Sequence, residues 1–212
     1  MPETPHARGS RLLESVKMTE TSARRLPKAE RREQLLETAL EIVREEGTDA
    51  LTLGHVAERA GVTKPIAYEH FKTRSGLLVA LYERMDELPR AKMVDALERT
   101  SKLPEIARVA SQAYIGCYTS LGPEWYAVSA ALAGSEEMEA TRRACLANYA
   151  EIFRAALAPH SKLSKRALYL RCVGIIGAAE GMAQEMLQRR TTEAAAVDAL
   201  TTLITSWIAQ EH

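Results

Sequence analysis

The stretch from Thr52 to Arg74, TLGHVAERAGVTKPIAYEHFKTR, constrains the fold more than any other part of the sequence. It contains two short segments with apolar residues at helical spacing, and Gly61 lies between them, where a chain leaving a helix needs a left-handed residue. Thr52 and Thr63 stand at the N-cap positions of the two segments, and Pro65 stands in the first turn of the second. Two helices joined by so short a turn form a helix-turn-helix, whose second helix fits the major groove of DNA.

Four motifs within residues 31–82 extend this pattern. They are LLETALEIVREEG before the two segments, T-x-x-x-V-A-x-x-A-G-V across the first segment and the turn, Y-x-H-F in the second segment, and K-T-R-S-G-L-L directly after it. With these motifs the region resembles the DNA-binding domain of the TetR family of transcriptional regulators. The resemblance implies an all-α protein. An N-terminal three-helix, homeodomain-like helix-turn-helix domain would precede a C-terminal helical domain for ligand binding and dimerisation.

Two positions depart from the family pattern. Gly54 stands where a polar side chain that helps to read bases is usual, and Ala67 stands where a larger aliphatic residue is usual. The first helix of the motif is therefore expected to read few bases, and the packing beneath the recognition helix is expected to be lean.

The composition favours helices along the whole chain. Ala, Leu, Glu and Arg are abundant, whereas the 212 residues include only 11 Gly and 8 Pro. No run of about 18 uncharged apolar residues occurs and the N-terminus lacks an apolar signal core, so we expect no membrane span and a cytoplasmic location. The 3 cysteines, Cys117, Cys145 and Cys172, fit no zinc or disulfide spacing. We therefore expect reduced structural thiols and no metal site.

The chain is expected to begin with a flexible N-terminal tail, residues 1–27, because this segment has no sustained apolar periodicity. Met18 is an alternative start to Met1, and the sequence does not decide between them. Residues 28–86 would then form the helix-turn-helix DNA-binding domain, whose first helix is predicted from Lys28 to Glu46.

Pro89 predicts the end of the helix that follows the motif, with a domain boundary near residues 86–90. Residues 87–212 would then form the helical ligand-binding and dimerisation domain. Helix-breaking Gly and Pro residues and helix-capping residues predict the helices of this domain at about Arg90–Thr100, Pro104–Leu121, Glu124–Ala133, Ser135–Leu157, Ser164–Gln188 and Thr192–Ala209.

The charge distribution is uneven although the net charge is zero, with 28 basic and 28 acidic residues. Five Lys and Arg residues between positions 24 and 32 face a single Glu in the same window. Such a basic edge either approaches DNA phosphates or keeps a protein surface solvated, and the sequence leaves both interpretations open.

The second helix of the motif would carry most DNA contacts, since base edges give specificity and phosphates give affinity. Lys64, at its N-terminus, would reach a guanine or a phosphate, and Pro65 and Ile66 would reach a thymine methyl group. Tyr68, at the position of the family's tyrosine, would stack on a methyl group or donate to a phosphate. His70 would donate to a phosphate or be a structural histidine. The full set predicted to bind DNA is Thr52, Thr63, Lys64, Pro65, Ile66, Tyr68, His70, Lys72 and Arg74.

The last two helices carry the signals for dimerisation. Gly174, Gly177 and Gly181 fall within the helix Ser164–Gln188, where each glycine costs about 1 kcal/mol against alanine unless close helix approach offsets it. The last helix has a long apolar stripe. Packing inside one chain explains both features, but the resemblance implies a homodimer through these two helices, which would read a palindromic operator.

Aromatic residues gather in the C-terminal part of the chain. Aromatic walls with a few polar groups form small-molecule pockets, although aromatic residues at helical spacing more often belong to a plain core. Glu180 stands among small apolar residues, and a buried carboxylate needs a partner or a proton. The candidate residues for a ligand pocket are Tyr114, Tyr118, Trp125, Tyr126, Tyr149 and Glu180. The effector would be an unidentified small molecule, and no cofactor is predicted.

The sequence gives no support for an enzyme, because it lacks a phosphate-binding glycine loop, an HExxH zinc motif and a nucleophile elbow. The resemblance implies a dimeric, sequence-specific regulator of transcription, by default a repressor that a ligand releases from its operator; activation and corepression stay open. The alternative is a helical ligand-binding or scaffold protein with a non-functional helix-turn-helix. Binding to duplex DNA distinguishes the two.

Overall fold

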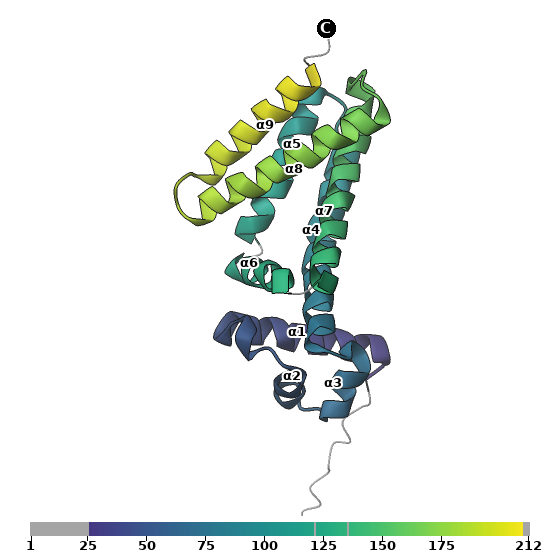
Figure 1. Cartoon of the computed structure of the whole chain (residues 1–212), viewed down its shortest axis with the longest axis vertical. Coiled ribbons are helices and arrows are strands. Elements are labelled where there is room, and N and C mark those ends of the chain that lie inside the picture. The colour runs from purple at the N-terminus through teal and green to yellow at the C-terminus, as the bar shows by residue number, and fades with distance from the viewer. Residues whose placement is uncertain (1–25, 121, 135, 210–212) are drawn as a thin grey trace, which may run out of the picture.

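The computed structural model describes residues 26–120, 122–134 and 136–209, and every regular element in these ranges is helical (Figure 1). The all-α prediction is therefore confirmed. Met1, Met18 and nearly all of the predicted tail lie outside the described residues. The α-helices of the described part are α1 (Lys28–Glu46), α2 (Leu53–Arg59), α3 (Lys64–Phe71), α4 (Arg74–Glu98), α5 (Leu103–Ser120), α6 (Gly122–Ala131), α7 (Glu136–Leu157), α8 (Lys165–Leu187) and α9 (Glu193–Ala209).

The predicted first helix is confirmed at both ends by α1. Its C-terminal end follows from Gly47, which has a φ of +84° and donates its backbone N–H to the carbonyl of Val43 at 3.0 Å. Short 3-10 turns follow α1, α6 and α7, at Thr48–Ala50, Leu132–Gly134 and Ala158–His160.

A first hydrophobic core joins α1 to α4 at the lower end of the molecule (Figure 1). Ile42, Val56 and Leu77 are fully buried in it. The same core takes Trp125 and Val128 from α6, which packs against α1. The helices around the helix-turn-helix are thus supported by a helix from the C-terminal part of the chain.

The prediction that a helix ends at Pro89 is wrong, because α4 runs through this residue to Glu98. Proline inside a helix costs about 3 kcal/mol through its missing N–H and its steric clash. Met85 and Met93, one turn before and one turn after it, are buried in the two hydrophobic cores of the protein, and their burial offsets that cost. α4 is therefore one continuous rod between both cores, and a domain limit at residues 86–87 stays a prediction.

The second hydrophobic core lies at the upper end, where α5, α7, α8 and α9 pack around the last turns of α4 (Figure 1). Ile115, Phe153, Ile175 and Leu200 are fully buried in it. α9 lies along α5 and α8, and α7 packs against α8. Among the described helices, none has the length and apolarity that a membrane span requires.

Candidate nucleic-acid interface and ligand cavity

The turn between α2 and α3 has the predicted geometry. Gly61 adopts a φ of +66°, and the N–H of Val62 donates to the carbonyl of Ala57 at 2.9 Å to close α2. The hydroxyl of Thr52 caps α2 by accepting from the N–H of His55 at 3.1 Å. Thr63 holds the N-cap position of α3, but its side chain makes no capping hydrogen bond, which leaves its hydroxyl available to a phosphate.

One face of α3 points away from the protein core. Lys64 and Pro65 are exposed, and Tyr68 is 52% exposed. Ala67 and Phe71 lie beneath them and are buried. Lys64 and Tyr68 are four residues apart and hence neighbours on the helix surface. This face therefore offers a cation, a hydroxyl donor and apolar surface, which are the groups that bind phosphates, guanine edges and thymine methyl groups.

Ile66 and His70 lie on the flank of this face and are only partly exposed. The imidazole of His70 lies 5.9 Å from the ring of Phe71, measured between ring centroids. Burial lowers the pKa of His70, and nearby cations such as Lys28 lower it further, although Glu69 acts in the opposite direction. The geometry thus favours a structural role for His70 over the alternative that it donates to a DNA phosphate.

An ion pair that the sequence analysis missed joins the start of α1 to α3. The Nζ of Lys28 lies 3.1 Å from the Glu69 carboxylate, and both side chains are largely exposed. The hydrogen bond and charge of Lys28 lower the pKa of Glu69. Lys28 thus partly neutralises the one acidic residue of α3, which would otherwise repel DNA phosphates.

A tight joint connects α3 to α4. Lys72 has a φ of +63°, and the N–H of Thr73 donates to the carbonyl of Phe71 at 2.7 Å, which makes a three-residue γ-turn. The hydroxyl of Thr73 then caps α4 by accepting from the N–H of Gly76 at 3.0 Å. A Cβ atom at Gly76 would lie 2.2 Å from the Phe71 carbonyl oxygen. The end of α3 is thus pressed against the first turn of α4, so that the two helices are expected to move together.

Arg74, predicted to contact the DNA backbone, is held by the protein itself. Its Nε donates to the carbonyl of Leu51 at 2.8 Å, and one terminal nitrogen donates to the carbonyl of Thr48 at 2.6 Å. These bonds tie α4 to the segment between α1 and α2. Arg74 therefore has a structural role, and only its remaining N–H groups are left for a phosphate. Sequence reasoning missed this role because the acceptors are backbone carbonyls.

Most of the predicted pocket residues line one small cavity between α4, α5, α6, α7 and α8. Its volume is about 20 Å³, room for one water molecule. Tyr126, predicted with them, is 45% exposed and does not line the cavity, because its neighbour Trp125 holds the inward position on α6. The lining residues are Tyr82, Asp86, Tyr114, Cys117, Tyr118, Trp125, Ser129, Leu146, Tyr149 and Glu180.

Asp86 of α4 is a buried carboxylate that the sequence analysis missed. It is 4% exposed and accepts a hydrogen bond from the hydroxyl of Tyr149 on α7 at 2.7 Å. Its second oxygen lies 3.3 Å from the Nε of Arg90. Burial, with Asp86 close by, raises the pKa of Cys145 to about 12, so this thiol stays protonated. The signal was an aspartate one helical turn after Tyr82, on the buried face of its helix.

Glu180 of α8 has the partner that the sequence demanded. Arg142 of α7 lies 3.5 Å from its carboxylate and also pairs with Glu139 at 3.0 Å. Burial raises the pKa of Glu180, and Arg142 acts against that rise. The Glu180 carboxylate is therefore partly neutralised by an arginine of α7.

Residues 35–81 match the model of the family described as "Bacterial regulatory proteins, tetR family". The chain carries a TetR-family DNA-binding domain. The match covers α2, α3 and the parts of α1 and α4 that pack on them.

TetR-family relatives agree with this assignment. The transcriptional activator FasR of Mycolicibacterium smegmatis is 36% identical over 90 residues, which are 42% of this chain and 41% of that protein. The class C tetracycline repressor of Escherichia coli is 46% identical over 54 residues, 26% of this chain and 25% of that protein. The chain thus matches less than half the length of these relatives, of which one is named as a transcriptional activator and the other as a repressor.

The fold of the described part of the chain, beyond the matched residues, is also similar to that of TetR-family proteins. A TetR-family regulator from Rhodococcus sp. superposes with a TM-score of 0.67 at 20% identity, and the alignment covers 84% of this chain and 99% of that chain. At this identity the similarity establishes the fold alone.

The two departures from the TetR-family pattern have a structural explanation. A Cβ atom at Gly54 would lie 3.5 Å from the Cε of Lys64, so the Lys64 side chain lies across α2 where the family usually has a polar residue. Ala67 is fully buried between α3 and the rest of the domain. Because Gly54 has no side chain, the side chain of Lys64 has room to lie across α2. Ala67 fills little volume beneath α3, which agrees with the lean packing expected there.

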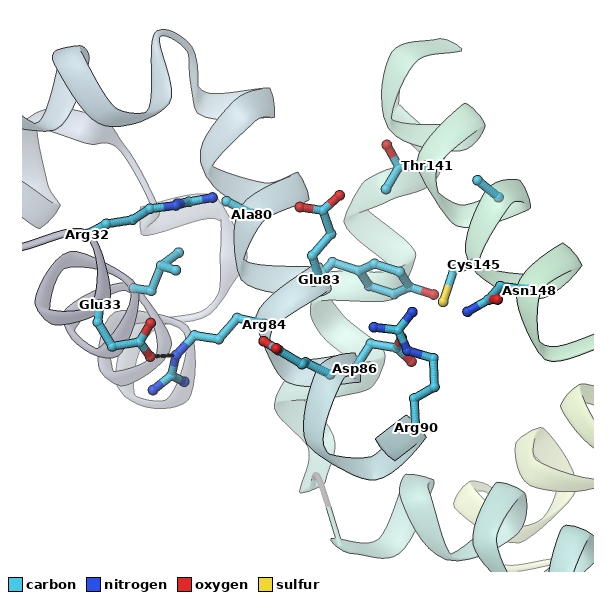
Figure 2. Close-up of a pocket in the computed structure, with 14 residues that line it drawn as sticks. Arg32, Glu33, Ala80, Glu83, Arg84, Asp86, Arg90, Thr141, Cys145 and Asn148 are labelled. Atoms are coloured by element: carbon cyan, nitrogen blue, oxygen red, sulfur yellow. Dashed lines mark hydrogen bonds and ion pairs between the residues drawn. The ribbon is translucent and has the colours of Figure 1, made fainter. Parts of the chain in front are cut away.

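An open cleft of about 650 Å³ lies between α1, α4 and α7 (Figure 2). Two of its arginines are in ion pairs, since Arg84 pairs with Glu33 (Figure 2) and Arg90 pairs with Asp86. The third, Arg32, lies over the ring of Phe71 and has one buried terminal nitrogen without a hydrogen-bond partner among the described residues. Tyr82 and Asp86 line both this cleft and the small cavity. These two residues therefore form part of the wall between the cleft and the cavity.

Proposed function

We propose that this protein is a sequence-specific DNA-binding regulator of transcription and not an enzyme. Residues 28–86 would bind DNA, and residues 87–212 would bind a ligand and form the dimer. The observation that carries the proposal is the outward face of α3, where Lys64, Pro65 and Tyr68 stand exposed on a helix whose other face is buried. Such a regulator works in the cytoplasm, where the bacterial chromosome lies.

The proposed contacts follow from the positions of the side chains. Lys64 and Tyr68 would bind base edges or phosphates, and Pro65 would contact a thymine methyl group. Thr52, Thr63 and the exposed Lys72 would bind phosphates. Ile66, His70 and Arg74 would contribute less, because each is partly buried or bonded within the protein.

A mobility-shift experiment with palindromic promoter fragments tests this function. We expect binding that weakens as salt rises, and we expect Lys64→Ala combined with Tyr68→Ala to weaken it about a hundredfold. Lys102→Ala with Tyr126→Ala is the matched control, since it removes an exposed lysine and an exposed tyrosine that are not among the residues proposed to contact DNA. If the Lys64→Ala, Tyr68→Ala variant binds DNA as tightly as the parent protein, α3 is not the helix that recognises DNA. That result would favour the alternative of a scaffold or ligand-binding protein.

The dimer is proposed to form through α8 and α9. On α8, Leu170 is 60% exposed and Val173 is 44% exposed. Apart from the neighbouring backbone of α8 itself, a Cβ atom at Gly177 or Gly181 would meet no described atom within 4 Å, so no other described helix uses the close approach that these glycines permit. A second copy packed on this face would bury the apolar residues and form a four-helix interface. The twofold dimer would then read a palindromic operator.

Sedimentation analysis tests this interface. We expect Leu170→Glu combined with Val173→Glu to convert the dimer to a monomer, because two desolvated carboxylates would face their own copies across the twofold axis. Leu88→Glu is the control, since Leu88 is 61% exposed on α4 and lies outside the proposed interface. A parent protein that sediments as a monomer, or a double variant that remains dimeric, contradicts the assignment.

Ligand-induced release from the operator is proposed because α4 connects the cavity to the reader. Asp86 lines the cavity on α4, and the first turn of the same helix is pressed against the end of α3. A ligand that opens the cavity would shift α4 and weaken DNA binding through a coupling of about 1–3 kcal/mol. The relatives include both an activator and a repressor. A reporter gene placed behind the bound promoter shows whether this protein represses or activates transcription. We expect repression, and therefore higher expression of the reporter when the gene for this protein is deleted.

A further inference from the structure

The small cavity has two carboxylates in its lining. Asp86 and Glu180 line it, and among the described residues that line it there is no Lys, Arg or His. Their partners Arg90 and Arg142 pair with them from outside the lining. An anionic ligand would therefore meet two carboxylates in the lining, and the arginines nearest to them stand outside it and are already paired with those carboxylates, so the lining offers an anion no cation.

The walls of the cavity are aromatic. The whole chain has only 2 Trp, 7 Tyr and 2 Phe, and five of these rings meet here. Tyr82 stacks on Trp125 with ring centroids 4.7 Å apart, and Tyr114 meets Tyr149 edge to face at 5.3 Å. Tyr118 lies 6.2 Å from Tyr114. Faces of aromatic rings attract cations that come within about 6 Å of the ring centroid.

We propose that this cavity binds an organic cation, a protonated or quaternary amine that carries an aromatic ring, with its charge between Asp86 and Glu180. The inference rests on the proposed ligand-responsive function and adds the chemical class of the effector. The carboxylates would balance the charge of the ligand, and the rings would stack on its aromatic part and contact its alkylammonium group.

The adjoining cleft provides the entry route. The cavity holds about one water molecule, so a ligand must open it, and the cleft of about 650 Å³ shares the wall formed by Tyr82 and Asp86. Glu83 and Glu87 also line the cleft, and no ion pair joins either of them to a described residue. An entering cation would be attracted by these carboxylates and would replace Arg90 beside Asp86. Because Asp86 belongs to α4, this exchange acts directly on the helix that positions α3.

Fluorescence of Trp125 tests the ligand class. Trp207→Phe leaves Trp125 as the only tryptophan, and this protein is titrated without DNA with three probes of similar shape: phenyltrimethylammonium, the neutral tert-butylbenzene and the anionic benzenesulfonate. We expect saturable quenching by the cation, about tenfold weaker binding of the neutral compound, and no binding of the anion. Equal affinity for the neutral compound, no saturable quenching by the cation, or preference for the anion overturns the proposal.

Two charge-removing variants sharpen the test in the same background. Glu180→Gln and Asp86→Asn should each weaken binding of the cation about fivefold or more and leave tert-butylbenzene unaffected. Glu105→Gln, at an exposed carboxylate on α5, should change neither. If circular dichroism shows that Asp86→Asn does not fold, Glu180→Gln decides alone, and unchanged affinity for the cation refutes the proposal.

Measurement without DNA separates this inference from the proposed function. A protein that binds the cation but no promoter fragment contradicts the regulatory function and supports the ligand class. A protein that binds DNA but not the cation contradicts the ligand class alone.

Discussion

Replacing Gly76 by alanine will destabilise the protein by about 3 kcal/mol, the upper end of the usual cost of overpacking. The added Cβ would lie 2.2 Å from the carbonyl oxygen of Phe71, a distance at which backbone atoms must move. The neighbouring γ-turn resists that movement, because Lys72 already holds a φ of +63° that side chains rarely adopt. The free energy of unfolding, measured in urea by far-UV circular dichroism, should fall accordingly.

Gly116→Ala is the matched control for this prediction. Gly116 also lies in a helix, but a Cβ atom there would be 3.7 Å from the nearest atom, a carboxylate oxygen of Glu193, which is ordinary contact. The substitution should therefore stabilise the protein, by up to about 1 kcal/mol, through the higher helix propensity of alanine. A Gly76→Ala protein as stable as the parent would show that α3 does not press on α4 in solution.

The joint at Gly76 and the continuity of α4 together explain how a cavity could control a distant helix. α4 begins at the γ-turn behind α3, continues through Pro89 and carries Asp86 between these points. Each of the two cores holds one part of this rod. A shift of α4 at Asp86 would therefore reach α3 through covalent and tightly packed contacts, without a flexible segment between them.

The helical framework was predictable because its signals are local. Gly47 and Gly61 end α1 and α2 in left-handed conformations, and Thr52 caps α2 through its own hydroxyl, as the sequence indicated. The helix end predicted at Pro89 was wrong for the opposite reason. The contacts that stabilise α4 on both sides of Pro89 come from residues distant in the sequence, and the local sequence does not reveal them. Tertiary packing overrode a strong local preference at that residue.

The candidate sites were predictable only in part. The aromatic residues of the sequence predicted most of the cavity lining. Trp125 and Tyr126 are adjacent in the sequence, however, and only the orientation of α6 in the folded protein determines which of them faces the cavity. The spacing of Asp86 from Tyr82 placed it on the buried face of its helix, but its hydrogen-bond partner could not be predicted, because Tyr149 lies 63 residues away on α7. Arg74 was assigned to DNA because carbonyl acceptors such as that of Leu51 have no sequence signature.

We expect Asp86→Ala to lower the free energy of unfolding by about 3 kcal/mol, because it leaves the Tyr149 hydroxyl and Arg90 without the carboxylate that both now contact. The same helix provides a matched control. Asp95 and Arg99 form an ion pair with the same spacing of four residues at 2.6 Å, but the Asp95 side chain is 57% exposed. Asp95→Ala should therefore change the stability by less than about 0.5 kcal/mol. Equal effects of the two substitutions would show that Asp86 is not buried as described.

A double-mutant cycle isolates the bond between Asp86 and Tyr149. Tyr149→Phe alone should cost about 1–2 kcal/mol, since it removes the hydroxyl donor but leaves the buried carboxylate paired with Arg90. Once Asp86 is alanine, the hydroxyl has lost its acceptor, so the double variant should cost about 1 kcal/mol less than the sum of the single variants. Strict additivity would mean that the 2.7 Å hydrogen bond between α4 and α7 contributes no coupling. In that case α4 would be held to α7 by packing alone, and a ligand beside Asp86 would have no polar contact through which to release it.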